Sequence, residues 1–191
     1  MSLFEGVDTV VLYDELAYED ALPVAWSPLE RPPDAAASAA LTERNLKALH
    51  AFTALEELGA ADKHEDKAGC AGDIIRLEMK INIALELLGQ LLVASKPRPT
   101  LTAVRFNALG MVWRSSVPHP VPNTHGLVEI YLKDSIAQPL GFIAYIRSVS
   151  ADGVVKARFA PPGEPVSDLI EKLAFRRHRR QVAGARQPRR G

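Results

Sequence analysis

What the sequence has little of excludes several classes of protein. Cys70 is the only cysteine among 191 residues, so no disulfide can form within the chain and nothing requires an oxidising compartment. The first residues lack the basic and apolar regions of a secretory signal. The longest apolar stretch, residues 74–94, is interrupted by charged side chains, which excludes a transmembrane helix. We therefore expect a cytoplasmic protein that does not insert into a membrane.

The sequence also lacks the motifs of common catalytic and metal centres. Its five histidines are scattered, and none belongs to an HExxH pair. There is no GxSxG and no Walker-type loop. His64, His119 and His125 lie in polar or proline-rich stretches and are expected at the surface, and Cys70 between two glycines suits a helix start. We predict no enzyme activity, no catalytic residue and no metal site.

Net charge is absent too, because 23 basic side chains balance 23 acidic ones. This average conceals a split along the chain. Residues 176–191 contain seven arginines and no acid, so the first 175 residues carry 16 basic against 23 acidic groups. The sequence therefore combines an acidic body with a basic C-terminal end.

What is present divides into three parts. The first part has strand-like runs at Thr9–Tyr13 and Leu22–Trp26 and ends at the break Arg31–Asp34. The second part, residues 35–95, is rich in Ala, Leu, Glu and Lys without proline, which predicts helices, with Asp73 as the cap of the second one.

The third part reads as short antiparallel strands separated by Pro, Asn, Asp and Gly. The expected strand regions are Ala103–Ser115, Gly126–Lys133, Gln138–Val149 and Gly153–Ala160. A terminal helix follows over Ser167–Gln181, with Ser167 as its cap. This pattern predicts an α+β fold, with a small barrel or sandwich, an inserted pair of long coiled-coil-type helices and a C-terminal helix.

A heptad pattern in the second predicted helix is the first signal of function. Apolar residues alternate at spacings of 3 and 4, which is the geometry of a coiled coil. These positions are Ile74, Leu77, Ile81, Ala84, Leu88 and Leu91. The helix could pack against the Leu41–Leu58 stripe of its own chain. We favour self-association across chains, because the apolar surface exceeds what one partner helix would cover.

Several segments resemble a known family. Asp168–Gln181 (DLIEKLAFRRHRRQ) looks like the helix that closes a PilZ domain, a bacterial barrel whose members commonly bind cyclic di-GMP. Leu22–Trp26 (LPVAW) is similar to the family's first strand, and Ala103–Trp113 (AVRFNALGMVW) to the strand pair of its second motif. The resemblance implies one PilZ-like barrel domain over residues 1–182, with a helical oligomerisation insertion at 35–95 and a disordered basic tail at 183–191.

The inserted heptad helix resembles the atypical, oligomeric branch of this family. That likeness implies a homo-oligomer through residues 73–94, with a tetramer favoured over a dimer. It also implies a part in cyclic di-GMP-linked control of motility, biofilm formation or virulence, through a protein partner that the sequence does not identify.

The ligand motifs of the family match this chain only in part. The family places an RxxxR pair just before the first strand, where two guanidiniums grip phosphates. Here that stretch is Glu15–Ala21 (ELAYEDA), which is acidic. The second motif, [DN]xSxxG, aligns with Arg105–Gly110. The weak candidates for ligand contact are therefore Arg105, Asn107 and Gly110. Arg176 and Arg180 join them, because they have the RxxxR spacing, although at the opposite end of the domain from the family's pair. Family membership implies cyclic di-GMP binding, whereas the residues predict weak binding or none.

We favour a non-enzymatic signalling adaptor that acts through protein–protein contacts. The alternative is a nucleic-acid-associated protein that uses the C-terminal arginine tail. That alternative is not preferred, because the body is acidic and the sequence shows no basic face with interleaved aromatics on the strands. A salt-dependent affinity would distinguish the two.

Overall fold

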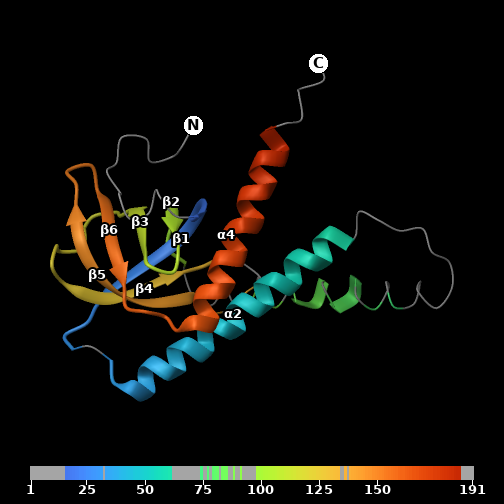
Figure 1. Cartoon of the computed structure of the whole chain (residues 1–191), viewed down its shortest axis with the longest axis horizontal. Helices are drawn as coiled ribbons and strands as arrows, with labels where there is room; N and C mark the ends of the chain where they lie inside the picture. The colour runs from blue at the N-terminus through green and yellow to red at the C-terminus, as the bar shows by residue number, and fades with distance from the viewer. Residues whose placement is uncertain are drawn as a thin grey trace.

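Six antiparallel strands form a closed barrel in the order β1-β2-β3-β6-β5-β4, with β4 pairing back to β1 (Figure 1). The structure is a computed structural model that describes residues 16–31, 33–61, 74, 77, 79–81, 83–85, 88, 91, 98–133, 136 and 138–185, without the side chains of 57–61 and 184–185. The strands are β1 Tyr18–Pro28, β2 Leu101–Phe106, β3 Gly110–Arg114, β4 His125–Ile130, β5 Leu140–Val149 and β6 Val154–Phe159. The predicted small antiparallel barrel is confirmed.

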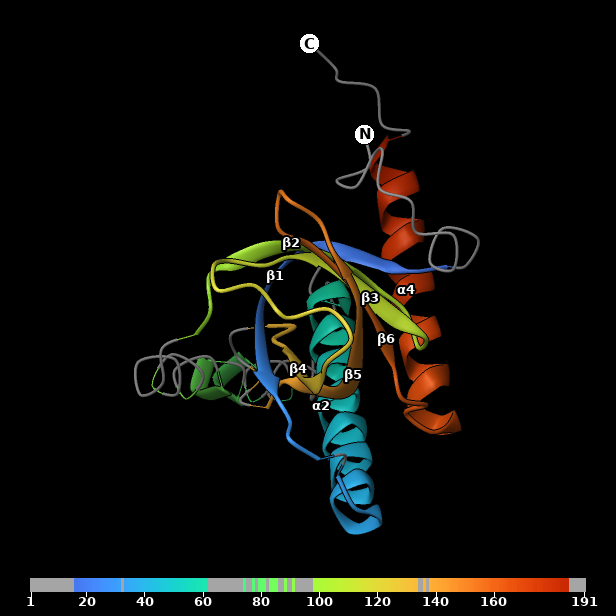
Figure 2. The ribbon, with the colours of Figure 1, turned by 90° about the vertical axis from the view of Figure 1, so that its left-hand side faces the viewer.

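Two helices, α2 (Ala35–Ala61) and α4 (Glu164–Ala185), lie against the barrel and against each other (Figures 1 and 2). Their buried residues belong to the same apolar cluster as the inward-facing side chains of the strands. Helix α2 contributes Ala48, Leu49 and Phe52, and α4 contributes Val166 and Ile170. Both helices are therefore part of the domain core, because their apolar stripes are covered by the barrel.

The alternation of side chains along the strands explains why the barrel closes around this core. On β5 the inward residues Leu140, Phe142, Ala144 and Ile146 are almost fully buried. The residues between them face outward, where α2 covers part of β5. A period of two places every second side chain on one face of a sheet, so the strand buries one face and presents the other.

A buried asparagine fixes α2 on the barrel. The Asn45 side chain donates to the Gly141 carbonyl at 2.7 Å and accepts from the Gly141 amide at 2.8 Å. Gly141 lies outside the paired stretch of β5 and β6, so these two bonds satisfy backbone groups that the ladder leaves open. A Cβ at Gly141 would lie 2.7 Å from Leu41 and closer still to Arg44. The missing side chain therefore lets α2 approach the strand.

Several predicted boundaries were wrong. Composition alone marked Ala103–Ser115 as one strand-rich region, and the structure divides it into the strand pair that the resemblance implied, with Asn107–Leu109 as the turn between β2 and β3. The closing helix begins at Glu164, after Gly163 with φ 89°, so Ser167 is not its cap and instead donates its hydroxyl to the Gly163 carbonyl. The helix continues to Ala185, so the first three residues of the predicted tail are helical. The predicted strand Thr9–Tyr13 and the predicted cap Asp73 lie outside the described residues.

The helical insertion is described in part. Helix α2 is the one long helix that the described part of residues 35–95 contains as an element, and it packs in the core. The described residues of the 74–91 segment are all helical. A coiled-coil pair is not shown and remains a proposal. Within the described residues, no helix has the length and apolar character needed to span a bilayer.

Candidate functional site

The acidic stretch at the start of β1 is paired with arginines of this same chain. Glu19 lies opposite Arg105 of β2 in the ladder, and their side chains form an ion pair in which both are less than one-quarter exposed. Asp20 forms an ion pair with Arg177 of α4 at 2.8 Å. We call Tyr18, Glu19, Asp20, Arg105 and Arg177 the polar seam. Its two carboxylates and two guanidiniums neutralise one another.

The neighbours of Arg177 hold it firmly in the polar seam. Its Nε donates to the Glu19 carbonyl at 3.3 Å, and its guanidinium lies 5.7 Å from the centre of the Tyr18 ring. The Tyr18 hydroxyl donates to the Asp20 carboxylate at 3.1 Å. Burial raises the pKa of Tyr18, and the adjacent Asp20 carboxylate raises it further, so the hydroxyl stays protonated. The polar seam therefore ties α4 to the first strand.

Asn107 and Gly110 stabilise the β2–β3 turn and its contact with β6. The Asn107 side-chain oxygen accepts from the amides of Leu109 at 2.9 Å and Gly110 at 3.2 Å. This is an Asx-type turn, in which the side chain replaces a backbone acceptor. A Cβ on Gly110 would lie 2.4 Å from the Ala157 carbonyl oxygen of β6. Glycine at 110 is therefore explained by the close approach of β6.

The predicted site residues on α4 are also engaged. Arg180 forms an ion pair with Glu56 of α2, and Arg176 is half-buried and not a free side chain. Arg105 and Arg177 thus contact neighbouring acids of β1, and Arg180 lies at the contact between α2 and α4. None of these contacts tests ligand binding, which remains a prediction for all five candidates.

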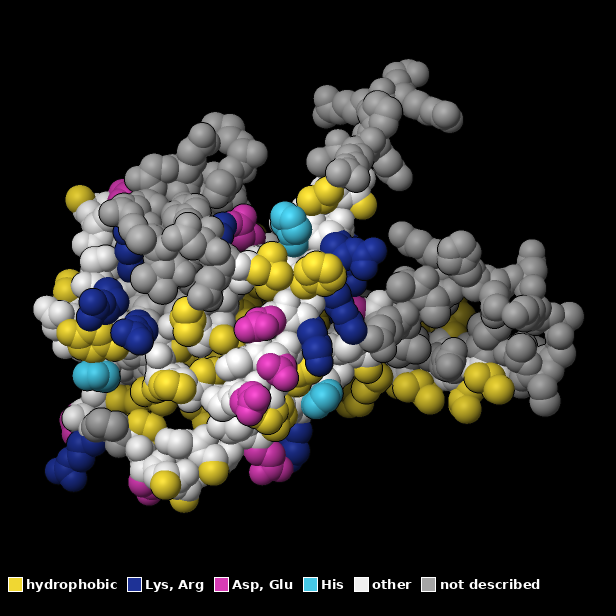
Figure 3. All heavy atoms as spheres, viewed as in Figure 1, with side chains coloured by type: hydrophobic (Ala, Val, Ile, Leu, Met, Phe, Trp, Pro, Cys, Tyr) yellow, Lys and Arg dark blue, Asp and Glu magenta, His cyan; other side chains and the backbone are white. Residues whose placement is uncertain are grey.

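The described strands carry a basic face with a neighbouring aromatic ring, which we did not expect from the sequence. Arg147 of β5 and the outward residues Lys156 and Arg158 of β6 lie on the outside of the barrel. Arg147 lies 5.7 Å from the centre of the Tyr145 ring, which in turn packs on His125. Figure 3 shows Lys and Arg side chains near a histidine over this part of the barrel. The face was missed because its members come from different strands and meet only through the register.

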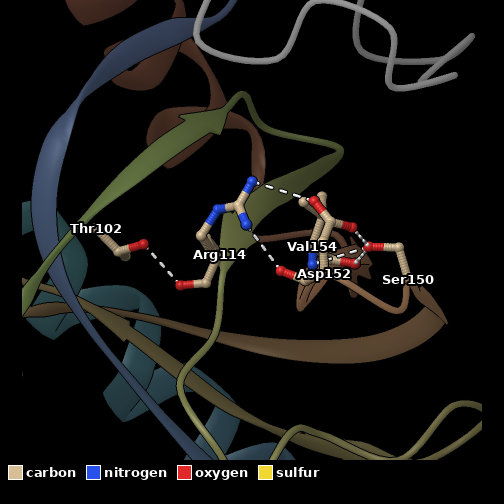
Figure 4. Close-up of polar contacts among 5 residues, drawn as sticks. All are labelled: Thr102, Arg114, Ser150, Asp152 and Val154. Atoms are coloured by element: carbon tan, nitrogen blue, oxygen red, sulfur yellow. Dashed lines mark hydrogen bonds and ion pairs between the residues drawn. The ribbon is translucent and has the colours of Figure 1, made fainter.

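The β5–β6 turn holds a second polar cluster, made by Arg114, Ser150 and Asp152 (Figure 4). Arg114 donates to the Asp152 carbonyl at 2.8 Å and to its carboxylate at 3.1 Å. Ser150 also donates to that carboxylate. This hydrogen bond, helped by the Arg114 charge, holds the pKa of Asp152 below its usual range. Because the groups satisfy one another at the tip of a hairpin, the cluster fixes the turn.

The heptad residues contrast with these paired groups. All ten described residues of the 74–91 segment are exposed, although most of them are large and apolar. Figure 3 shows hydrophobic side chains along this segment. The exposed large side chains are Ile74, Leu77, Met79, Ile81, Ile83, Leu85, Leu88 and Leu91. Ala48, Phe52 and Leu55 of the α2 stripe, the possible partner within the chain, pack instead in the domain core.

Two observations bear on small-molecule and metal binding in the described part of the chain. A small cavity of about 70 Å³ lies between α2 and β5, lined by Leu41, Asn45, Phe142 and Pro161 among others. Sites for small molecules usually occupy ~300 Å³ or more. Among the described residues no group of three His, Cys, Asp or Glu side chains could hold a metal ion.

The chain is similar to a known protein family and to a solved structure. Residues 49–187 match the family model of the atypical PilZ domain, a cyclic di-GMP receptor. A solved structure from Xanthomonas campestris superposes with a TM-score of 0.70 at 28% sequence identity, covering 92% of this chain and 95% of that one. That protein is pathogenic and is a tetrameric PilZ domain self-assembled through a helical bundle. No curated protein sequence matches the chain.

Proposed function

The chain belongs to the atypical PilZ family, and from that premise we propose that it is a self-assembling signalling adaptor without enzyme activity. PilZ domains are receptor and adaptor domains, so the family supplies the class of function. The observation that carries the proposal is the exposed heptad segment. Its apolar residues are left uncovered by the described part of their own chain.

The proposed assembly is a homo-oligomer held together by the 74–91 helices. Large apolar side chains along one helix gain most when partner helices cover them, at ~25 cal/mol per Å² of buried apolar surface. The helical bundle of the tetrameric relative supports this arrangement. The interface residues in the proposal are Ile74, Leu77, Ile81, Ala84, Leu88 and Leu91. We favour a tetramer over a dimer, because the segment is apolar beyond a single seam.

Sedimentation of a heptad variant tests this assembly. Leu77→Asp, Ile81→Asp and Leu88→Asp together should convert the oligomer to monomers, because charges cannot be buried in a helical bundle without partners. Lys80→Asp is a matched control, since it adds a charge change to the same helix at an exposed non-heptad position. An unchanged sedimentation coefficient for the triple variant would refute the heptad contact.

We also propose that this adaptor binds cyclic di-GMP weakly or not at all. Family likeness places phosphate-binding arginines just before the first strand, and acids occupy that stretch here. In addition, Glu19 already forms an ion pair with Arg105, the residue that begins the second motif. A phosphate at Arg105 would have to displace a carboxylate that is largely shielded from water. Signalling would then rest on protein partners, in the cytoplasmic control of motility, biofilm formation or virulence.

A nucleic-acid-associated role is the second candidate. The observation that favours it is the basic outer face of β5 and β6, not the C-terminal arginine tail. Arg177 and Arg180 pair with acids of the chain, whereas Arg147, Lys156 and Arg158 share an outer face with Tyr145. Aromatic and basic side chains together suit single-stranded nucleic acid. The test is fluorescence anisotropy with a labelled oligonucleotide over a series of salt concentrations. Arg147→Glu with Arg158→Glu should abolish any binding, and binding that persists would exclude this face.

A further inference from the structure

Helix α4 has an exposed face that is mostly acidic in its first half and basic in its second half. Glu164, Asp168 and Glu171 are exposed on the first half beside one base, Lys172, and Arg179 is exposed on the second half, which contains no acid. Figure 3 shows acidic side chains over the first part of α4 and basic ones further along it. Phe175 lies between the two halves and is 52% exposed. An exposed aromatic ring at the junction of opposite charges marks a surface for a partner.

The spacing of this face is symmetric about Phe175. Glu171 precedes Phe175 by four residues and Arg179 follows it by four, so all three share one side of the helix. The Arg179 guanidinium lies 5.8 Å from the centre of the Phe175 ring, which confirms their shared side. Asp168 and Val182 continue the symmetry at seven residues on either side, and both are exposed.

We propose that a second copy of this chain docks on α4 in antiparallel orientation, with the two-fold axis at Phe175. The two Phe175 rings would then pack on each other, and Glu171 of each copy would face Arg179 of the other. A parallel pair would instead place acid against acid and base against base. Antiparallel helices also oppose their dipoles favourably. Charge complementarity therefore selects this partner and this orientation.

This contact is separate from the heptad contact. It uses none of residues 74–91. Its base, Arg179, is also distinct from Arg177 of the polar seam and from Arg180, both of which pair with acids of their own chain. Each copy would therefore hold two different surfaces for other copies. Two weak contacts on one chain reinforce each other through effective concentration, so the α4 contact need not be strong alone.

Disulfide trapping tests the orientation directly. In a Cys70→Ser background, Phe175→Cys should form covalent dimers under mild oxidation, read on a non-reducing gel. Asp168→Cys is the matched control on the same face. In the proposed pair two Asp168 positions are ~21 Å apart along the helix axis, too far for a disulfide, so trapping should be roughly ten-fold slower. Equal rates at the two positions would overturn the proposal, as would faster trapping at 168.

A charge swap tests complementarity in the same assay. Adding Glu171→Arg to Phe175→Cys should slow dimer formation, because the new arginine of each copy then faces Arg179 of the other. Adding Arg179→Glu as well should restore the rate, since the pairs are re-formed with reversed sign. A double swap that stays as slow as the single one would overturn the pairing. The heptad contact is scored separately, by sedimentation, so failure of one contact is distinguishable from failure of the other.

Discussion

The polar seam and the 74–91 segment differ in whether their side chains have partners within the same chain. At the seam, Glu19 and Asp20 find their partners in Arg105 and Arg177 of the same chain. Along the heptad, the described apolar side chains find none within the described structure and remain exposed. The polar seam is complete within a single chain, and we propose that other chains cover the 74–91 segment.

This difference bears on two separate functions, nucleotide binding and self-assembly. A receptor for an anionic nucleotide needs guanidiniums that are not already used, whereas the two seam arginines are held by carboxylates. An assembly surface needs apolar groups that the chain itself does not bury. The contrast therefore favours assembly over ligand capture.

Breaking the link between α2 and the barrel should have the largest effect on stability. Asn45→Ala removes both hydrogen bonds to Gly141 and leaves two backbone groups without partners, which should lower the free energy of unfolding by about 2–5 kcal/mol. Urea unfolding followed by circular dichroism measures the change. Lys47→Ala, an exposed neighbour on the helix, should have little effect. A loss below about 1 kcal/mol would show that Asn45 does not fix α2.

Replacing Gly110 with alanine should have the second largest effect on stability. The Cβ of Gly110→Ala would lie 2.4 Å from a β6 carbonyl oxygen, so the strands must shift apart at a cost of about 1–3 kcal/mol. A thermal melt would record this as a lower Tm. If glycine at 110 served only a ligand, the melt would be unchanged, and the structural explanation would fail.

The ion pair between Asp20 and Arg177 should have a smaller effect. Both side chains are about one-third exposed, so solvent limits their coupling to roughly 0.2–1 kcal/mol. A double-mutant cycle with Asp20→Asn and Arg177→Gln measures that coupling, with Lys172→Gln as an exposed control on α4. Zero coupling would mean that the seam does not tie α4 to β1.

The smallest effect should be at Asp152, which is exposed. Its pKa is lowered in the folded chain, so it stabilises the fold at pH values above the pKa of the unfolded chain. That contribution disappears as the pH falls through the folded-state pKa. The difference in Tm between the unmodified chain and Asp152→Asn should therefore be present at neutral pH and vanish in acid. A difference that grows on acidification would contradict the assignment.

Local sequence signals predicted the barrel and the closing helix, because strand alternation and turn residues act over short distances. Composition alone ran Ala103–Ser115 together as one strand-rich region, and its division into β2 and β3 came from the family resemblance, because the Asx bonds of Asn107 leave no mark in composition. Local sequence signals also did not predict the core position of α2. Asn45 between Leu41 and Leu49 was the available signal, because an amide inside an apolar stripe indicates a buried hydrogen-bonding partner.

The candidate site could be predicted less well, because its meaning depends on partners far apart in the chain. The acidic stretch at 15–21 was visible in the sequence, and so were the α4 arginines. Their pairing required the β1–β2 register and the approach of α4 to β1. Acids near the start of the chain and arginines near its end partly neutralise each other, as in the pair of Asp20 with Arg177. A net charge of zero does not reveal this pairing.

We propose that the nucleotide site of the family is not available in this chain, because the seam arginines already pair with acids. Isothermal titration of the 191-residue chain with cyclic di-GMP tests this proposal. We expect no heat of binding at micromolar to submillimolar concentrations. A clear micromolar isotherm that is lost in Arg105→Ala would contradict it.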